Sequence, residues 1–297
     1  MKNNNKESDI ENVVPYKEFG LSSKFSAAKN LISTKDLVVL PLLSANSSEI
    51  STKRFISGDN AMDSAIIEGP SLNKFDMLVF FSLIKYFDTH CHESKYTFQS
   101  AEVSFSDLFE LMGLPKNQRT IVTKEKINAS VNRIRRLNII KKQTKRATIV
   151  INFISDVNLD LDVNDKSFEI FISNSFINYF RESTEDFLCH VDLNAYNSLG
   201  VNAARFYLYL TANQNFTYIA RKYVDMIFDL LTVDENNVIT HQVLERDATK
   251  RVQKALDELK DANLLNFGEI LKNPKTRKIE KINFNVNKNK FQNKQTS

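Results

Sequence analysis

Positive charge is concentrated in one stretch of this sequence, together with asparagine side chains. Between Lys116 and Arg146 there are eleven lysines and arginines against a single acid, Glu125. The net charge of the whole chain is only +4, so this excess is local. Such a basic segment is typical of a surface that binds a polyanion, and asparagine and arginine can also hydrogen-bond to base edges in DNA. The sequence therefore predicts a nucleic-acid-binding surface here.

The first part of this stretch has the periodicity of an amphipathic helix. Ile127, Val131 and Ile134 recur at i, i+4 and i+7, which places them on one face of a helix. The residues expected on the opposite face, with Asn128 at its margin, are Glu125, Ala129, Asn132, Arg133 and Arg136. A solvated surface helix without a ligand would show the same pattern, and it stays open as the alternative.

The second part of the stretch predicts a basic β-hairpin. A run of cations is followed by an alternating β-branched segment from Thr148 to Phe153, which favours a strand. In this arrangement the helix would contact the bases and the hairpin would contact the phosphates. We expect base reading by Asn128, Asn132, Arg133 and Arg136, and phosphate contact by Lys141, Lys142, Lys145 and Arg146.

The same pattern recurs near the C-terminus. Between His241 and Lys290 there are twelve lysines and arginines against seven acids. A second amphipathic helix buries Ala248, Val252, Ala255, Leu256 and Leu259, and a turn and a strand from Ile279 to Val286 follow it. In this copy we expect base reading by Arg246, Lys250, Gln253 and Lys254, and phosphate contact by Lys272, Lys275, Arg277 and Lys278.

Two shorter helices precede each basic helix. They are expected at 75–87 and 104–114 in the first copy and at 203–214 and 221–233 in the second. The order helix, helix, basic helix, basic hairpin thus appears twice, about 125 residues apart. It predicts an α+β, mainly helical fold of two tandem winged helix-turn-helix domains, each with its third helix suited to the major groove.

These repeats give a predicted domain organisation. Residues 1–70 form an N-terminal extension that is expected to be flexible and partly disordered, with a strand or a docked segment within 31–43. The first winged helix spans 71–155, a connector and the second winged helix span 156–287, and 288–297 form a basic disordered tail. The segment 167–180 begins as an alternating strand, with Phe168, Ile170 and Ile172 on one side, and is interpreted as the connector and the opening strand of the second unit.

Composition and motifs bound the class of protein. No apolar run reaches the ~18 residues of a membrane span, and the N-terminal residues lack the apolar core of a secretory signal. Two cysteines, Cys91 and Cys189, do not make a disulfide framework and are expected to be reduced, which favours a cytoplasmic protein. Neither glycine-rich phosphate loop motif is present, so we expect no nucleotide cofactor, and an ATPase or nucleotidyl-transfer role is disfavoured.

His90, Cys91 and His92 are the strongest candidates for metal ligands, with Cys189 and His190 far downstream. Zinc ligands in pairs normally need intervening residues so that both side chains can reach one ion. Adjacent residues lack this spacing, so the pattern favours a surface loop or partly buried thiols, and no metal site is expected.

With both copies in view, the chain resembles the plasmid replication initiators that bind repeated DNA sites, called iterons, through tandem winged helices. The resemblance covers about residues 71–286, and three features carry it: the duplicated order, the segment FEIFISNSFINYF, and NAARFYLYL with Arg205, Phe206 and Tyr207. It implies a protein without enzymatic activity that binds double-stranded origin repeats as a monomer, represses its own promoter as a dimer and so controls plasmid copy number. It also implies recruitment of host replication proteins and no membrane contact. The first 70 residues depart from the family pattern.

Two other functions remain open at this point. A winged-helix transcriptional regulator would have the same fold. A nicking initiator of rolling-circle replication would use a metal motif that His90, Cys91 and His92 loosely resemble, together with a nucleophilic tyrosine. The candidate tyrosines lie in aromatic stretches that are typical of a core: Tyr179, Tyr207, Tyr209 and Tyr218.

Overall fold

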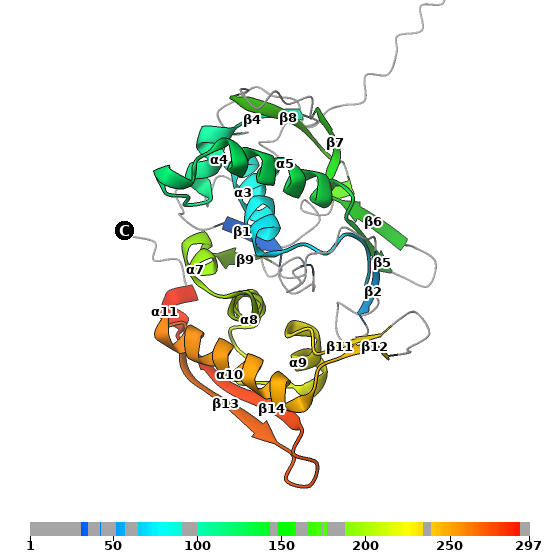
Figure 1. The fold of residues 1–297 in the computed structure, drawn as a ribbon, viewed down its shortest axis with the longest axis vertical. Coiled ribbons are helices and arrows are strands. Elements are labelled where there is room, and N and C mark those ends of the chain that lie inside the picture. Colours follow the sequence, from blue (N-terminus) through cyan, green and yellow to red (C-terminus); the bar gives the residue numbers. More distant parts are fainter. Residues whose placement is uncertain are drawn as a thin grey trace, which may run out of the picture.

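The molecule consists of two units stacked along its long axis (Figure 1). The computed structural model describes residues 31–34, 42, 52–56, 65–90, 100–142, 148–158, 166–173, 175–176, 188–233 and 239–291. In both units three helices precede a β-hairpin, which confirms the predicted α+β fold of two tandem winged helix-turn-helix units. No helix in these ranges is long and apolar enough to cross a membrane.

The first unit contains α3 (Lys74–His90), α4 (Phe105–Leu111) and α5 (Ile121–Arg135), followed by the hairpin of β5 (Asn138–Lys142) and β6 (Thr148–Asn152). Local sequence sets the helix ends. The side chain of Ser104 accepts the backbone N–H of Asp107 at the start of α4, as a helix N-cap does. Gly113 takes a positive φ of 66°, which lets the chain turn sharply after α4. A short 3-10 helix, η2 (Lys116–Gln118), then leads into α5.

The hairpin of the first unit belongs to a larger sheet. Its strand order is β2-β3-β5-β6, with β2 (Thr52–Ile56) and β3 (Ala65–Gly69) contributed by the chain before α3. In β3, Ile67 pairs with Ile139 of β5. The described strands of the first unit therefore begin before residue 71, where the sequence predicted the boundary. Strands Ile154–Asn158 and Ser167–Ile172 extend the described part of the first unit past the limit predicted at residue 155. Residues 288–291, predicted to belong to a disordered tail, form the short helix α11 (Lys288–Phe291), and Phe291 is buried.

The segment that was interpreted as the opening strand of the second unit lies in the first. It forms β8 (Ser167–Ile172), in a sheet of order β4-β8-β7 with β4 (Ser100–Ser104) and β7 (Ile154–Asn158). Phe168, Ile170 and Ile172 are buried on one side, as the alternation predicted. The assignment to the second unit was wrong because alternation shows which side of a strand is buried and leaves its pairing partner open. Here Phe168 pairs with Val103.

The second unit repeats the order with α8 (Val201–Ala212), α9 (Arg221–Ile227) and α10 (Glu245–Asp261), followed by β13 (Leu265–Lys272) and β14 (Ile279–Val286). A third strand, β10 (Tyr218–Ala220), completes a sheet of order β10-β14-β13. The helix predicted for 221–233 ends early. Asp229 takes a positive φ of 54°, and β11 (Leu231–Val233) then pairs with β12 (Ile239–Gln242).

A small element joins the two units. The helix α7 (Leu193–Ser198) lies between α3 and α8, and beside it β9 (Leu188–Val191) pairs with β1 (Leu31–Thr34) (Figure 1). The rings of Tyr196 and Phe81 meet edge to face with centroids 5.7 Å apart. The Lys74 ammonium donates to the backbone carbonyl of Asn197 at 2.6 Å, and the Gly200 N–H donates to the Glu258 carboxylate at 2.7 Å. These contacts fix the second unit against the first.

Candidate nucleic-acid interface

The predicted reading helix of the first unit is α5. The side chain of Thr120 caps its start by accepting the N–H of Thr123 at 3.3 Å. Ile127, Val131 and Ile134 are fully buried, as the periodicity predicted. The opposite side of the helix is therefore the side that can meet a ligand.

The predicted base-reading residues of α5 differ in how far they reach solvent. Arg136, at the C-cap, is exposed, and Asn132 is half-buried. Asn128 is also half-buried, and its amide oxygen is shielded from solvent with no hydrogen-bond partner among the described residues. Arg136 and Asn132 are thus the better placed of these side chains for contact with DNA.

Arg133 does not lie where the sequence predicted. Its guanidinium reaches back to α3 and binds the Asp76 carboxylate through two hydrogen bonds, of 3.0 Å from Nε and 2.6 Å from Nη2. Ser130 donates to the same carboxylate at 2.6 Å, and Asp76 is fully buried. A buried carboxylate needs paired donors of this kind, so Arg133 holds α5 against α3. We therefore remove Arg133 from the candidate base readers.

The wing of the first unit is described in part. Lys141 and Lys142 lie in β5, where they pair with Ile149 and Thr148 of β6. Lys145 and Arg146, which were predicted to contact phosphates, lie outside the described residues.

The second unit presents a row of polar side chains on α10. Arg246, Lys250 and Gln253 are exposed and share one face of the helix at i, i+4 and i+7. The Lys254 side chain is 80% exposed, and its Nζ lies 4.0 Å from Oε1 of Glu258, which is a loose ion pair. Gln253 donates to Asp257 at 2.9 Å, also on the helix surface. All four predicted base readers of this helix are therefore accessible from solvent.

The turn between β13 and β14 forms the wing of the second unit. The Asn273 side chain accepts the N–H groups of Lys275 and Thr276, both at 3.0 Å, and Arg277 takes a positive φ of 61°. The cations predicted to contact phosphates are all exposed on this turn or beside it: Lys272, Lys275, Arg277 and Lys278. The turn thus gathers four positive charges at one end of the hairpin.

Sequence reasoning missed an ionic network that fixes the start of α10. Arg221 of α9 contacts Asp225 at 2.7 Å and Glu245 at 2.8 Å, and Glu245 also accepts the N–H of Ile279 in β14. Burial alone would raise the pKa of Glu245, but these hydrogen bonds and the nearby cations hold it below its usual value. Glu245 and Arg221 are separated by 24 residues, so no local pattern marks this pair.

A second feature missed from the sequence is apolar. Ile121 and Val122, at the first turn of α5, are 54% and 56% exposed, and Leu244, the N-cap of α10, is 75% exposed. Ile121 and Val122 directly follow the polar segment 116–120, which is a signal that could have marked them. Leu244 follows the buried Val243, so its sequence gives no such signal.

The residues that a nicking enzyme or a metal site would use lie in different environments. Of the candidate nicking tyrosines, Tyr207 and Tyr209 are buried, and burial raises the pKa of both phenols. Tyr218 is exposed, and Tyr179 lies outside the described residues. Cys189 is buried, and His190 pairs with Ile32 across β9 and β1. Cys91 and His92 lie outside the described residues, and within them no three His, Cys, Asp or Glu side chains gather as metal ligands would.

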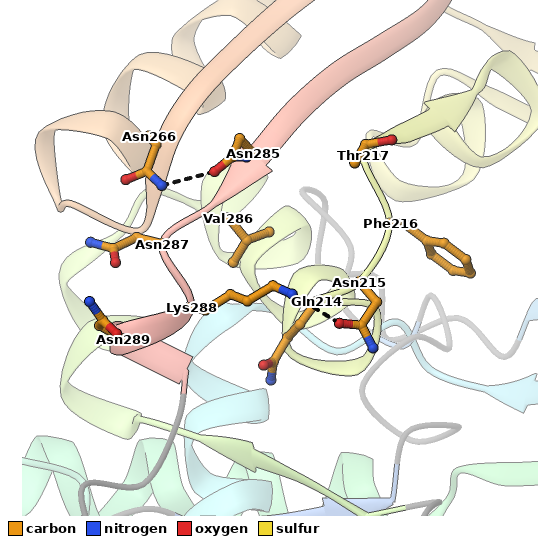
Figure 2. A pocket seen from close by; sticks show the side chains of 10 residues that line it. All are labelled: Gln214, Asn215, Phe216, Thr217, Asn266, Asn285, Val286, Asn287, Lys288 and Asn289. Atoms are coloured by element: carbon orange, nitrogen blue, oxygen red, sulfur yellow. Dashed lines mark hydrogen bonds between the residues drawn. The ribbon is translucent and has the colours of Figure 1, made fainter.

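A pocket of about 380 Å³ lies at one end of the second unit's sheet (Figure 2). Its walls are mainly amide side chains, and Asn266 donates to Asn285 at 2.8 Å and Lys288 to Asn215 at 3.2 Å. No carboxylate, histidine or cysteine lines it. Such a lining offers hydrogen bonds but no paired acid and base for catalysis.

Comparison with known proteins supports the architecture. No protein-family model matches the sequence, and no match was found among curated proteins. A crystal structure of domains 2 and 3 of RctB matches with a TM-score of 0.51 and 11% identity, over 84% of this chain and 95% of the other. A second structure of RctB domains 2–3 has a TM-score of 0.46 at 11% identity, over 84% and 96% of the chains. The Pi initiator protein in complex with iteron DNA has a TM-score of 0.48 at 12% identity, over 63% of this chain and 80% of the other.

At these identities the likeness concerns the fold. The first match spans most of both chains, so this chain shares the arrangement of RctB domains 2 and 3.

Proposed function

We propose that this protein is a sequence-specific DNA-binding initiator of plasmid replication. It binds repeated sites in double-stranded origin DNA, promotes opening of the adjacent duplex and recruits host replication proteins. Like the initiators that its sequence resembles, it acts in the cytoplasm without enzymatic activity, metal or cofactor, and changes between monomer and dimer. Copy-number control through its own promoter belongs to the same proposal.

One observation carries the DNA-binding part of this proposal. The reading helix of the second unit exposes Arg246, Lys250 and Gln253 along one face, and the wing of the same unit carries four exposed cations. In winged helices the third helix enters the major groove, and cations beside it neutralise phosphates. Base-reading and phosphate-binding chemistry thus belong to one folded unit.

The contacts between the units suggest how binding becomes duplex opening. Because α7 fixes the second unit against α3, the two reading helices present a set geometry to DNA. A rigid protein that engages two grooves imposes its own geometry on the duplex, and the cost of bending is lowest in flexible AT-containing steps. Several copies on neighbouring repeats would add their deformations at one end of the array and favour strand separation there.

The residue roles expected from the sequence, with Arg133 removed, belong to the same proposal. Base reading is assigned to Asn128, Asn132, Arg136, Arg246, Lys250, Gln253 and Lys254, and phosphate contact to Lys141, Lys142, Lys145, Arg146, Lys272, Lys275, Arg277 and Lys278. Arg133 has the structural role described above.

Footprinting of the full chain on the DNA that flanks its own gene tests the proposal. Protection of direct repeats about two helical turns apart, next to an AT-rich block, is the expected result. Protection of one inverted repeat ahead of another gene would favour a transcriptional regulator. A 5′-linked covalent adduct on supercoiled origin DNA with a divalent metal would favour a nicking enzyme.

A further inference from the structure

At the starts of both reading helices, aliphatic side chains are exposed while neighbouring polar side chains hydrogen-bond to nearby groups of the protein. At the start of α5, Thr123 donates to the carbonyl of Gln118, and the Arg119 Nε donates to the carbonyl of Leu114 at 3.0 Å. Ile121 and Val122 are left more than half exposed. Isoleucine and valine are among the residues most often buried in proteins, and here two adjacent ones are not.

The second unit shows an exposed aliphatic side chain at the same point of its third helix. At the start of α10, Glu245 turns back to Arg221 and to the N–H of Ile279, while Leu244 beside it is 75% exposed. Single exposed aliphatic residues are common on protein surfaces. Their recurrence at the first turn of the third helix in both units argues for a shared ligand.

The position of these side chains indicates which ligand they suit. The N-terminal residues of a recognition helix are the ones that approach base edges in the major groove. Along those edges, donors and acceptors suit arginine, lysine, asparagine and glutamine, and the one apolar group is the C5 methyl of thymine. An aliphatic side chain at this point gains affinity by covering that methyl and loses it opposite a polar edge.

We propose that Ile121 and Val122 in the first unit, and Leu244 in the second, recognise thymine methyl groups in the bound duplex. This inference rests on the proposed function, because it requires both helices to enter the major groove. It adds a preference for thymine at one position or step in each half of the binding site. Apolar contact sets this preference, independently of the hydrogen bonds that residues further along each helix make to the bases.

Replacing thymine by uracil tests the inference, because it removes the methyl and leaves the base-pairing and groove hydrogen-bond pattern unchanged. The probe is a duplex selected from a random library by the full chain, with each thymine replaced in turn. We expect two short clusters of sensitive positions, with affinity reduced about fourfold for each methyl lost, as for burial of one methylene-sized group.

Variants of the exposed residues assign each cluster to a helix. Ile121→Gln combined with Val122→Gln removes both exposed aliphatic side chains of the first unit, and with this double variant the uracil penalty should vanish in one cluster only. Leu244→Gln should remove the penalty in the other cluster. Val150→Gln is the matched control, because Val150 is also aliphatic and 49% exposed but lies in β6, outside both helices, and both penalties should persist.

The outcomes separate this inference from the function on which it rests. If the selection returns no preferred sequence, sequence-specific binding itself fails. If a sequence is selected but uracil binds as well as thymine at every position, the methyl contact is wrong and the DNA-binding function stands. Penalties that persist in the Ile121→Gln/Val122→Gln double variant and in Leu244→Gln would mean that DNA shape, and not these side chains, senses the methyl.

Discussion

Asp76 and Arg133, 57 residues apart, form a two-bonded ion pair between the first and third helices of the first unit. Asp76 also takes part in the start of α3, where its carboxylate accepts the N–H of Asn73 at 2.9 Å and the Asn73 side chain accepts the N–H of Asp76. One buried carboxylate therefore sets both the first turn of α3 and the position of α5.

Arg133→Ala should destabilise the fold, in contrast to the neighbouring surface arginine. Removing one partner leaves the Asp76 carboxylate buried without its cation, which costs about 3 to 5 kcal/mol. Arg136→Ala should change the free energy of unfolding by no more than about 0.5 kcal/mol, because Arg136 is exposed. Urea denaturation of both variants measures the difference. Equal stability of the two would contradict the structural role of Arg133.

Arg246→Ala and Lys250→Ala should weaken specific DNA binding and leave stability unchanged. A lost base contact costs about 1 to 3 kcal/mol of discrimination, whereas a lost phosphate contact lowers affinity for all sequences alike. Titrations with specific and random duplexes separate the two effects. Lys166→Ala is the control, since Lys166 is exposed, carries the same charge and lies beside β8. A similar loss in this control would show that only net charge matters.

Replacing the four wing cations Lys272, Lys275, Arg277 and Lys278 with glutamine should flatten the salt dependence of DNA binding. Each lost phosphate contact reduces the slope of log affinity against log salt by about 0.9. Affinity measured at several salt concentrations gives the slope. The matching replacement in the first unit, at Lys141, Lys142, Lys145 and Arg146, compares the two wings. A slope that stays unchanged would show that the replaced wing does not contact DNA.

Glu245→Gln should reduce stability at neutral pH and make it less sensitive to acid. The pKa of Glu245 is lowered in the folded protein, so its ionised form is bound more favourably there than in the unfolded chain. This contribution is present above the unfolded pKa of about 4.3 and is lost as pH falls through the lower folded value. Burial raises the pKa of nearby Asp225, so Asp225 changes the pH dependence of stability in the opposite direction. Both proteins contain Asp225, so the effect of Glu245 is taken from the difference between the variant and the wild type. Denaturation midpoints across this range should converge for the two proteins in acid. Midpoints that stay equally far apart would contradict the network.

Gly69→Ala should destabilise the first unit although it adds only a methyl group. Gly69 has a φ of 122°, and a Cβ there would lie 2.4 Å from the carbonyl oxygen of Arg136. Both the backbone conformation and the contact exclude a side chain. The loss in free energy of unfolding should therefore be larger than ~1 kcal/mol, the size of the effect of a Gly-to-Ala change where the backbone tolerates alanine. Thermal unfolding measures it. A melting temperature equal to wild type would mean that β3 is not packed on the end of α5.

The amino-acid sequence by itself determined the local features of this protein. Helical periodicity identified the buried faces of α5 and α10, because a repeat of 3.6 residues places Ile127, Val131 and Ile134 on one side wherever the helix packs. Charge and repetition identified the two winged helices. Alternation also identified the buried side of β8.

Tertiary structure decided which distant groups meet. Periodicity places Arg133 opposite the main apolar row, but only the position of α3 shows that Asp76 lies within its reach. Likewise β8 carries the same alternation in either unit, and its pairing with β4 depends on contacts that are far apart in sequence. These choices depend on long-range packing and hydrogen bonding, which a local pattern does not encode. The exposed faces of α5 and α10 were therefore predictable as surfaces, and the fold decided which side chains are available on them.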